Sequence, residues 1–213
     1  MSKQATLATY LALAPVIPVL VIDDATHAVP LAQALLAGGI GIIEVTLRTN
    51  AALHAIGAMA RAVPGMIIGA GTILTPRQYH DACNAGAQFI VSPGATDALL
   101  ATAQQSEIPF LPGAATPTEI MTLRDAGYHV QKFFPAEPAG GIPMLKALAA
   151  PLADVQFCPT GGITPASAGD YLALANVTCI GGSWLTPSAL LSAQNWPRIT
   201  ELACDAARLR APP

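Results

Sequence analysis

The feature that most constrains the fold is a repeated alternation of short apolar runs with segments of helical periodicity. The runs that predict strands lie at 16–22, 40–47, 66–70, 88–91, 108–111, 129–134, 155–158 and 177–180. Helical patterns follow them at 24–37, 51–63, 76–84, 98–104, 117–125, 141–149 and 165–174. Three of these helices begin with a threonine cap before proline, at Thr75-Pro76, Thr116-Pro117 and Thr164-Pro165. Such strict alternation predicts parallel βα units.

Eight units of this kind favour an α/β fold of the closed (β/α)8 TIM-barrel type over an open doubly wound sheet. An open sheet would be expected to carry a glycine-rich dinucleotide turn after its first strand, where this chain has Asp23-Asp24. A short helical pattern at 2–13 precedes the first strand, and apolar residues at helical spacing over 187–210 predict a helical closure. We therefore expect residues 1–213 to form a single barrel domain.

The composition predicts a self-associating protein with a small-residue surface. Hydrophobic residues make up 53% of the 213 residues, charged residues only 11%, and mean hydropathy is +0.49. The net charge of −3 provides no basic surface for nucleic acid or for a membrane. The apolar stretch at 11–22 is broken by Pro15 and Pro18 and lacks the pattern of a signal peptide. We expect a cytoplasmic homo-oligomer.

No spacing of histidine or cysteine suggests a metal site. The widely spaced cysteines form no CxxC pair and are expected to be free thiols; they are Cys83, Cys158, Cys179 and Cys204. The four histidines are scattered over different elements. The sequence thus predicts neither a metal nor a cofactor.

Lys132 is a charged residue in a predicted buried strand, a position that calls for a chemical explanation. It lies in the apolar run 129–134, and alternation places it on one face with Val130 and Phe134. Burial among such neighbours disfavours the ammonium form and frees the amine as a nucleophile toward carbonyl carbons. The alternative is a lysine at a strand end that extends to solvent or pairs with a carboxylate.

The second strand ends with a carboxylate and a guanidinium four residues apart. Alternation puts Glu44 and Arg48 on one face, and active sites of barrels lie at the carboxyl ends of the strands. A buried carboxylate is suited to general acid/base chemistry, and an arginine fork is suited to a substrate carboxylate. The alternatives are a merely structural Glu44–Arg48 ion pair or an outward, solvated face.

Glycine-rich turns follow several of the predicted strands. The glycines of the stretch 69–76 would let the backbone approach a ligand, and Thr72 supplies a hydroxyl. The alternative is that this stretch is an ordinary βα turn with no role in binding. Paired glycines at Gly161-Gly162 and Gly181-Gly182 come after the seventh and eighth strands, each before a helix. In barrels, backbone N–H groups at these two places commonly receive a phosphate.

Five motifs in this order give the chain a family resemblance: Glu44-Val45-Thr46-Leu47-Arg48-Thr49, Gly69-Ala70-Gly71-Thr72, Lys132-Phe133-Phe134-Pro135-Ala136-Glu137, Pro159-Thr160-Gly161-Gly162-Ile163 and Gly181-Gly182-Ser183-Trp184-Leu185. From about residue 16 to 184 the sequence resembles the bifunctional 2-keto-3-deoxy-6-phosphogluconate (KDPG) / 4-hydroxy-2-oxoglutarate (KHG) aldolases. The resemblance implies a class I aldolase on a (β/α)8 barrel, usually a homotrimer, acting in the Entner–Doudoroff pathway.

The resemblance also implies roles for individual residues. Lys132 would form the Schiff base, and Glu44 would transfer protons. The substrate-binding residues would be Arg48 and Thr72 for the pyruvate carboxylate, Pro93 and Phe134 near the pyruvate, and Thr160, Gly161, Gly162, Gly182 and Ser183 for the hydroxyls and phosphate. Thr160 replaces an aliphatic residue of a related branch that acts on the galactonate epimer, which favours the gluconate substrate. Cleavage would release pyruvate and glyceraldehyde 3-phosphate, with a side activity on KHG that releases pyruvate and glyoxylate.

Two other functions fit the same residues. An isomerase or epimerase of a sugar phosphate would use Glu44 as its base and Lys132 only for its charge. A non-catalytic barrel would bind phosphorylated sugars as a sensor. An assay for released pyruvate separates cleavage from both.

Overall fold

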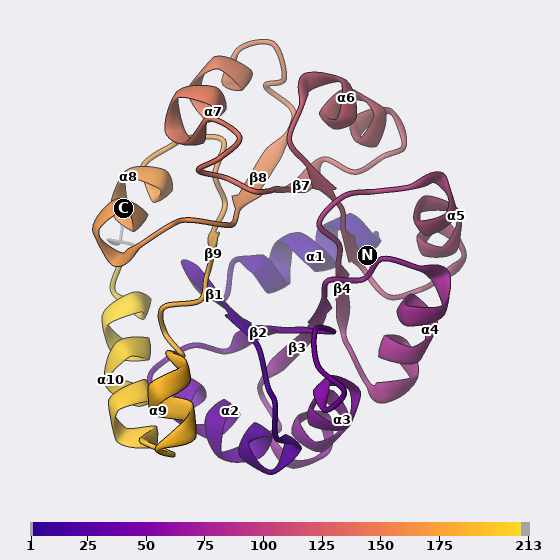
Figure 1. Ribbon diagram of the computed structural model, residues 1–213. Helices are drawn as coiled ribbons and strands as arrows, with labels where there is room; N and C mark the ends of the chain where they lie inside the picture. The colour runs from indigo at the N-terminus through magenta and orange to yellow at the C-terminus, as the bar shows by residue number, and fades with distance from the viewer. Residues whose placement is uncertain (1, 210–213) are drawn as a thin grey trace.

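The computed structural model describes residues 2–209, in which short parallel strands curl into the wall of a barrel (Figure 1). The strands are β1 (Val16–Leu20), β2 (Ile42–Thr46), β3 (Ile67–Gly71), β4 (Phe89–Val91), β5 (Phe110–Leu111), β6 (Gly113–Ala114), β7 (Val130–Phe133), β8 (Gln156–Pro159) and β9 (Ile180–Gly182). Their order is β5-β4-β3-β2-β1-β9 in one sheet and β6-β7-β8 in the other.

Two junctions join these sheets into one closed wall. Pro112 alone separates β5 from β6, so the two pieces are one barrel strand interrupted at a residue without a backbone N–H. On the other side, bridges between Phe157 and Val177 and between Thr160 and Gly181 connect β8 to β9. Counting β5 and β6 together gives the eight strands of a (β/α)8 barrel, as predicted.

Helices form an outer ring around this wall (Figure 1). They are α2 (Ala28–Ala37, after the 3-10 turn Ala25–His27), α3 (Ala52–Ala62), α4 (Pro76–Ala85), α5 (Asp97–Gln105), α6 (Pro117–Asp125), α7 (Gly141–Ala149), α8 (Pro165–Leu172), α9 (Ser188–Ser192) and α10 (Trp196–Ala207). The predicted caps Thr75, Thr116 and Thr164 are confirmed, because each side chain accepts an N–H three residues on. Within residues 2–209, every helix is too short or too polar to cross a bilayer.

The amino-terminal helix α1 (Lys3–Leu11) closes the end of the barrel where the strands begin. Its Gln4 side chain accepts the N–H of Val130 at 3.2 Å and donates to the carbonyl of Phe110 at 3.4 Å, and these are the first residues of β7 and β5. Leu7 and Leu11 are fully buried beneath the wall. Access to the barrel interior is therefore from the carboxyl ends of the strands.

Two predicted elements near the carboxyl terminus differ most from the structure. The last strand spans 180–182 rather than 177–180, because it pairs with β1 from Val16 onward, whereas Val177 makes only one isolated bridge. The predicted helical segment 187–210 is two helices, α9 and α10, separated by Gln194, whose φ of +50° a helix cannot accommodate. Residue 210 and the other ends of the predicted domain, 1 and 211–213, lie outside the described residues.

Candidate active site

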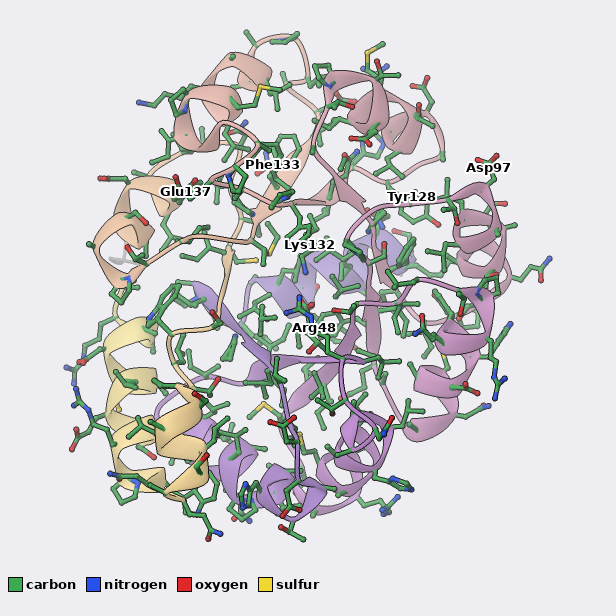
Figure 2. All side chains as sticks on the ribbon, viewed as in Figure 1. Arg48, Asp97, Tyr128, Lys132, Phe133 and Glu137 are labelled. Atoms are coloured by element: carbon green, nitrogen blue, oxygen red, sulfur yellow. The ribbon has the colours of Figure 1, made fainter. Side chains whose placement is uncertain are left out.

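A buried lysine and a buried carboxylate meet inside the barrel. Lys132 Nζ lies 3.1 and 3.3 Å from the two carboxylate oxygens of Glu44. The two residues are 5% and 4% exposed and come from β7 and β2, which lie apart in the barrel wall. Figure 2 shows Lys132 near the barrel axis. Removing either charge alone would leave the other buried and uncompensated.

The expectation that Glu44 is buried beside Arg48 is wrong. Strand β2 ends at Thr46, so Arg48 lies in the following turn and no longer obeys the alternation of the strand. Arg48 is exposed, whereas the carboxylate of Glu44 is directed inward to Lys132. The alternative in which Lys132 pairs with a carboxylate is therefore realised, and its partner is the predicted proton-transferring residue.

Glycines make room for this pair. A Cβ built on Gly71 would come within 2.0 Å of the Glu44 carboxylate, and one on Gly69 would overlap the ring of Phe89. Gly69 and Gly71 thus allow other protein groups to pack closely, rather than allowing a ligand to approach the backbone. Gly113, which is in register with Lys132, similarly admits the backbone of Pro93. This contact places Pro93 beside the strand that adjoins the lysine.

Arg48 is held at the mouth of the barrel by a strained neighbour. Its Nε donates a 3.2 Å hydrogen bond to Thr72 Oγ1. Thr72 has a φ of +59°, which is uncommon for a threonine and costs on the order of 1 kcal/mol. The side chains of Thr46 and Thr49 donate to the carbonyls of Leu20 and Ile22 and tie the turn that contains Arg48 to the end of β1.

A cavity of about 430 Å³ opens at the carboxyl ends of the strands. It is lined by Val19, Arg48, Phe134, Pro135, Glu137, Pro138, Thr160, Gly161, Gly162, Ile163, Gly181 and Ser183. Lys132 Nζ lies 5.4 Å from the centroid of the Phe134 ring, which links the buried pair to the cavity. Six predicted binding residues line it, namely Arg48, Phe134, Thr160, Gly161, Gly162 and Ser183.

The other predicted residues lie near this cavity without lining it. Thr72 is connected to it through Arg48. The space beside Gly182 is filled by the ring of Trp184, and the adjacent Gly181 lines the cavity instead. A Cβ on Gly181 would lie 2.3 Å from Thr160 Oγ1, so alternation in β9 turns Gly181 inward and Gly182 outward. Both glycines belong to the predicted pair after the last strand, but the family resemblance singled out Gly182, and the structure turns Gly181 to the cavity.

The turn after β8 is built from backbone. Gly161 and Gly162 have φ values of +105° and +83°, in the left-handed region that favours glycine. The carbonyls of Thr160 and Gly161 accept N–H groups of Ala136 and Glu137 at 2.8 and 3.0 Å, which fixes the turn against the loop after β7. Helix α8 begins directly afterwards, so this end of the cavity lies next to a helix N-terminus.

A neighbouring cavity of about 390 Å³ lies between the loops after β1 and β9 and shares Val19 and Ser183 with the first. Asp23 and Asp24 line it, together with His27. Two carboxylates disfavour an anionic ligand here, whereas the first cavity is lined by the cationic Arg48 and by Phe134, whose ring lies 5.4 Å from Lys132 Nζ. The cavity beside Phe134 is therefore the better candidate for the site.

Fold and site define the class of barrel enzymes that act through a lysine amine at the carboxyl ends of the strands. The family model for KDPG and KHG aldolase matches residues 7–202. The KHG/KDPG aldolase of Escherichia coli K12 is 53% identical over 192 residues, 90% of each chain. The chain belongs to the KDPG and KHG aldolase family.

Two solved structures are similar over nearly the whole chain. One is the KDPG aldolase of Legionella pneumophila with pyruvate captured at low pH as a covalent carbinolamine intermediate. It is 49% identical, has a TM-score of 0.92 and covers 94% of this chain and 97% of its own. The other is the KDPG aldolase of Zymomonas mobilis with 3-phosphoglycerate, 44% identical with a TM-score of 0.93 and 97% coverage of both chains.

Proposed function

We propose that this protein is a class I aldolase that cleaves KDPG to pyruvate and glyceraldehyde 3-phosphate through a Schiff base on Lys132. The observation that carries the proposal is the buried contact between Lys132 Nζ and the Glu44 carboxylate, next to the Phe134 ring that lines the cavity. Family membership and the carbinolamine of the Legionella relative support the same chemistry. The resulting iminium acts as the electron sink, so the proposal requires no cofactor.

Imine formation requires the neutral amine of Lys132, and Glu44 is close enough to remove the proton from the ammonium. The carboxylate accepts a proton from the Lys132 ammonium across the 3.1 Å contact. The amine then attacks C2 of the substrate and forms a carbinolamine. Glu44 returns the proton to the departing hydroxyl, which leaves as water and yields the iminium.

Cleavage uses the same two residues. Glu44 takes the proton of the C4 hydroxyl, the C3–C4 bond breaks, and its electron pair moves into the iminium to give an enamine. The aldehyde product leaves as glyceraldehyde 3-phosphate. Glu44 then protonates the enamine carbon, and hydrolysis of the imine releases pyruvate and restores Lys132. One carboxylate thus alternates between base and acid.

The two ends of the substrate fit the two ends of the cavity. Arg48, supported by Thr72, binds the pyruvate carboxylate, with Pro93 and Phe134 beside the pyruvate carbons. The distal hydroxyls and phosphate bind along Thr160, Gly161, Gly162, Gly182 and Ser183. Thr160 supports the gluconate over the galactonate epimer. KHG lacks the phosphate and reacts as a slower second substrate, giving pyruvate and glyoxylate.

The wider setting belongs to the same proposal. The chain acts in the cytoplasm as a single-domain barrel that assembles into a homotrimer, consistent with a composition of 53% hydrophobic and 11% charged residues. Light scattering of the purified protein tests the assembly. A mass equal to one or two chains would contradict the trimer without affecting the chemistry.

Borohydride reduction in the presence of pyruvate tests the central step. Reduction of the imine leaves a stable adduct on the attacking lysine, which mass spectrometry of the labelled peptide locates. We expect the adduct on Lys132, together with pyruvate release from KDPG in a coupled assay. A folded protein that gives no adduct at saturating pyruvate would exclude class I chemistry and favour the isomerase or sensor.

A further inference from the structure

An anionic side chain stands at the end of the cavity that is proposed to receive a phosphate. Glu137 is the last residue of the Lys132 motif and lines the cavity beside the Gly161-Gly162 turn. A Cβ built on Gly162 would lie 2.7 Å from Cβ and Cγ of Glu137, so the aliphatic stem of Glu137 packs against the turn. A free carboxylate at this position would repel an incoming phosphate.

The carboxylate of Glu137 is anchored by Tyr171. Tyr171 Oη donates a 2.7 Å hydrogen bond to Glu137 Oε1, and the tyrosine, which lies in α8, is fully buried. The site of a Cβ on Gly141, the first residue of α7, is 3.0 Å from Tyr171 Oη and 3.5 Å from Glu137 Oε2. The anchored carboxylate therefore lies beside the first turn of α7, where the helix dipole favours negative charge.

In Figure 2, Glu137 lies away from Lys132 and Arg48 and toward α7 and α8. Burial, together with the bond to Glu137, raises the pKa of Tyr171 well above its usual value. The phenol is thus a neutral hydrogen-bond donor over the whole working pH range. It stabilises one direction of the Glu137 carboxylate without adding a charge of its own.

We propose that Tyr171 is a positioning residue that holds the Glu137 carboxylate away from the Gly161-Gly162 turn and thereby sets the preference for phosphorylated over unphosphorylated substrates. The inference rests on the proposed function, because it assigns the phosphate to that turn. It predicts that a Glu137 side chain released from Tyr171 weakens binding of the phosphorylated substrate specifically.

Three variants test the inference. Tyr171→Phe removes the anchoring hydroxyl, and Glu137→Asp shortens the side chain by one methylene so that it cannot span the 2.7 Å bond. Each should raise KM for KDPG about tenfold and change kcat/KM for KHG by less than about twofold. The double variant Tyr171→Phe/Glu137→Gln carries no charge to release and should recover the wild-type ratio of the two kcat/KM values.

Tyr79→Phe is the matched control. Tyr79 is also fully buried, and its Oη donates a 3.0 Å hydrogen bond, to the carbonyl of Ile108. Its loss removes a similar bond outside the cavity, so both substrates should keep their ratio. The Glu137→Asp variant leaves the buried tyrosine intact and keeps the test valid if Tyr171→Phe does not fold.

Equal losses on KDPG and KHG in Tyr171→Phe and Glu137→Asp would overturn the inference, as would a double variant that keeps the altered ratio. Borohydride trapping of pyruvate separates this failure from failure of the proposed function. An adduct on Lys132 with an unaltered substrate ratio contradicts only the role of Tyr171. Absence of the adduct in the wild-type protein contradicts the aldolase itself and with it the inference.

Discussion

The two ends of the cavity are built in different ways. The inner end is the almost fully buried pair Lys132 and Glu44, charged side chains on strands that contact each other at 3.1 Å and adjoin the cavity lining at the Phe134 ring. The outer end consists of backbone in the left-handed conformation at Gly161 and Gly162, flanked by hydroxyl side chains. Among the residues that line the cavity, Arg48 alone is a cation.

The difference agrees with the role proposed for each end. Covalent chemistry needs one nucleophile and one acid/base group at fixed separation, and strands in a packed barrel hold them rigidly. Anion binding can use several N–H groups and hydroxyls, which loops and a helix N-terminus supply. Changes at the inner end should therefore reduce turnover of every substrate, whereas changes at the outer end should alter the choice between substrates.

The largest effect is expected for Lys132→Met. The variant keeps an unbranched side chain but has no amine, so turnover of both KDPG and KHG should fall by more than about 10⁴-fold. A coupled pyruvate assay measures this loss. Lys146→Met, at an exposed position in α7, is the matched control and should retain normal turnover. Substantial residual activity in Lys132→Met would show that the inner end is not where the covalent bond forms.

Arg48→Ala tests the junction between the two ends. Loss of a guanidinium that binds a carboxylate should raise KM for pyruvate in the trapping reaction about 10- to 100-fold. The preference for KDPG over KHG should stay the same, because both substrates carry this carboxylate. Arg77→Ala, whose side chain is 90% exposed in α4, serves as control. A selective loss on KDPG alone would instead place Arg48 at the phosphate.

Gly162→Ala should affect the outer end selectively. The added Cβ would lie 2.7 Å from Glu137, and the φ of +83° is unfavourable for alanine, so the turn must distort. We expect about tenfold weaker binding of KDPG, little change for KHG, and a loss of about 1–2 kcal/mol in the free energy of unfolding. The KM values for KDPG and KHG measure the effect on binding, and urea denaturation measures the effect on stability.

Gly169→Ala should change the free energy of unfolding in the opposite direction. Gly169 lies within α8, and a Cβ there meets no atom within 4 Å. Alanine is the better helix former, so this variant should stabilise the protein by about 0.5–1 kcal/mol and leave the substrate ratio unchanged. Equal kinetic effects of the two substitutions would mean that the glycine turn has no special part in binding the phosphorylated substrate.

Periodicity in the sequence was sufficient to predict the barrel and to single out Lys132. The eight strand–helix units and the threonine–proline caps are local signals, and they are confirmed in the structure. Lys132 was conspicuous because a charge in an apolar strand has few structural explanations. Gly161 and Gly162 were recognisable as paired glycines that follow the seventh predicted strand, and both have positive φ values in the structure.

The sequence could not reveal contacts that depend on closure of the barrel. Glu44 and Lys132 are 88 residues apart and meet only because β2 and β7 enclose the same interior. Alternation suggested Arg48 as the partner because it assumed that β2 continued to residue 48. The bond between Tyr171 and Glu137 likewise depends on how α8 packs beside the loop after β7, which no local pattern encodes.

The smallest effect is expected at the α6 cap, outside the cavity. Backbone N–H groups of Ala115 and Thr116 donate to the Glu119 carboxylate, and these hydrogen bonds, led by that from Ala115, hold the pKa of Glu119 below its usual value. A lowered folded-state pKa adds stability that is present above about pH 4.5 and is lost as the pH falls through the folded value.

Glu119→Gln should therefore lower the free energy of unfolding by about 0.5 kcal/mol at pH 7 and by less at pH 3, measured by urea denaturation. Glu107→Gln, which removes the same charge at an exposed position outside the cap, is the charge-matched control. Because neither end of the cavity contains Glu119, a change in substrate ratio in Glu119→Gln would contradict the division of the site into a chemical end and a selective end.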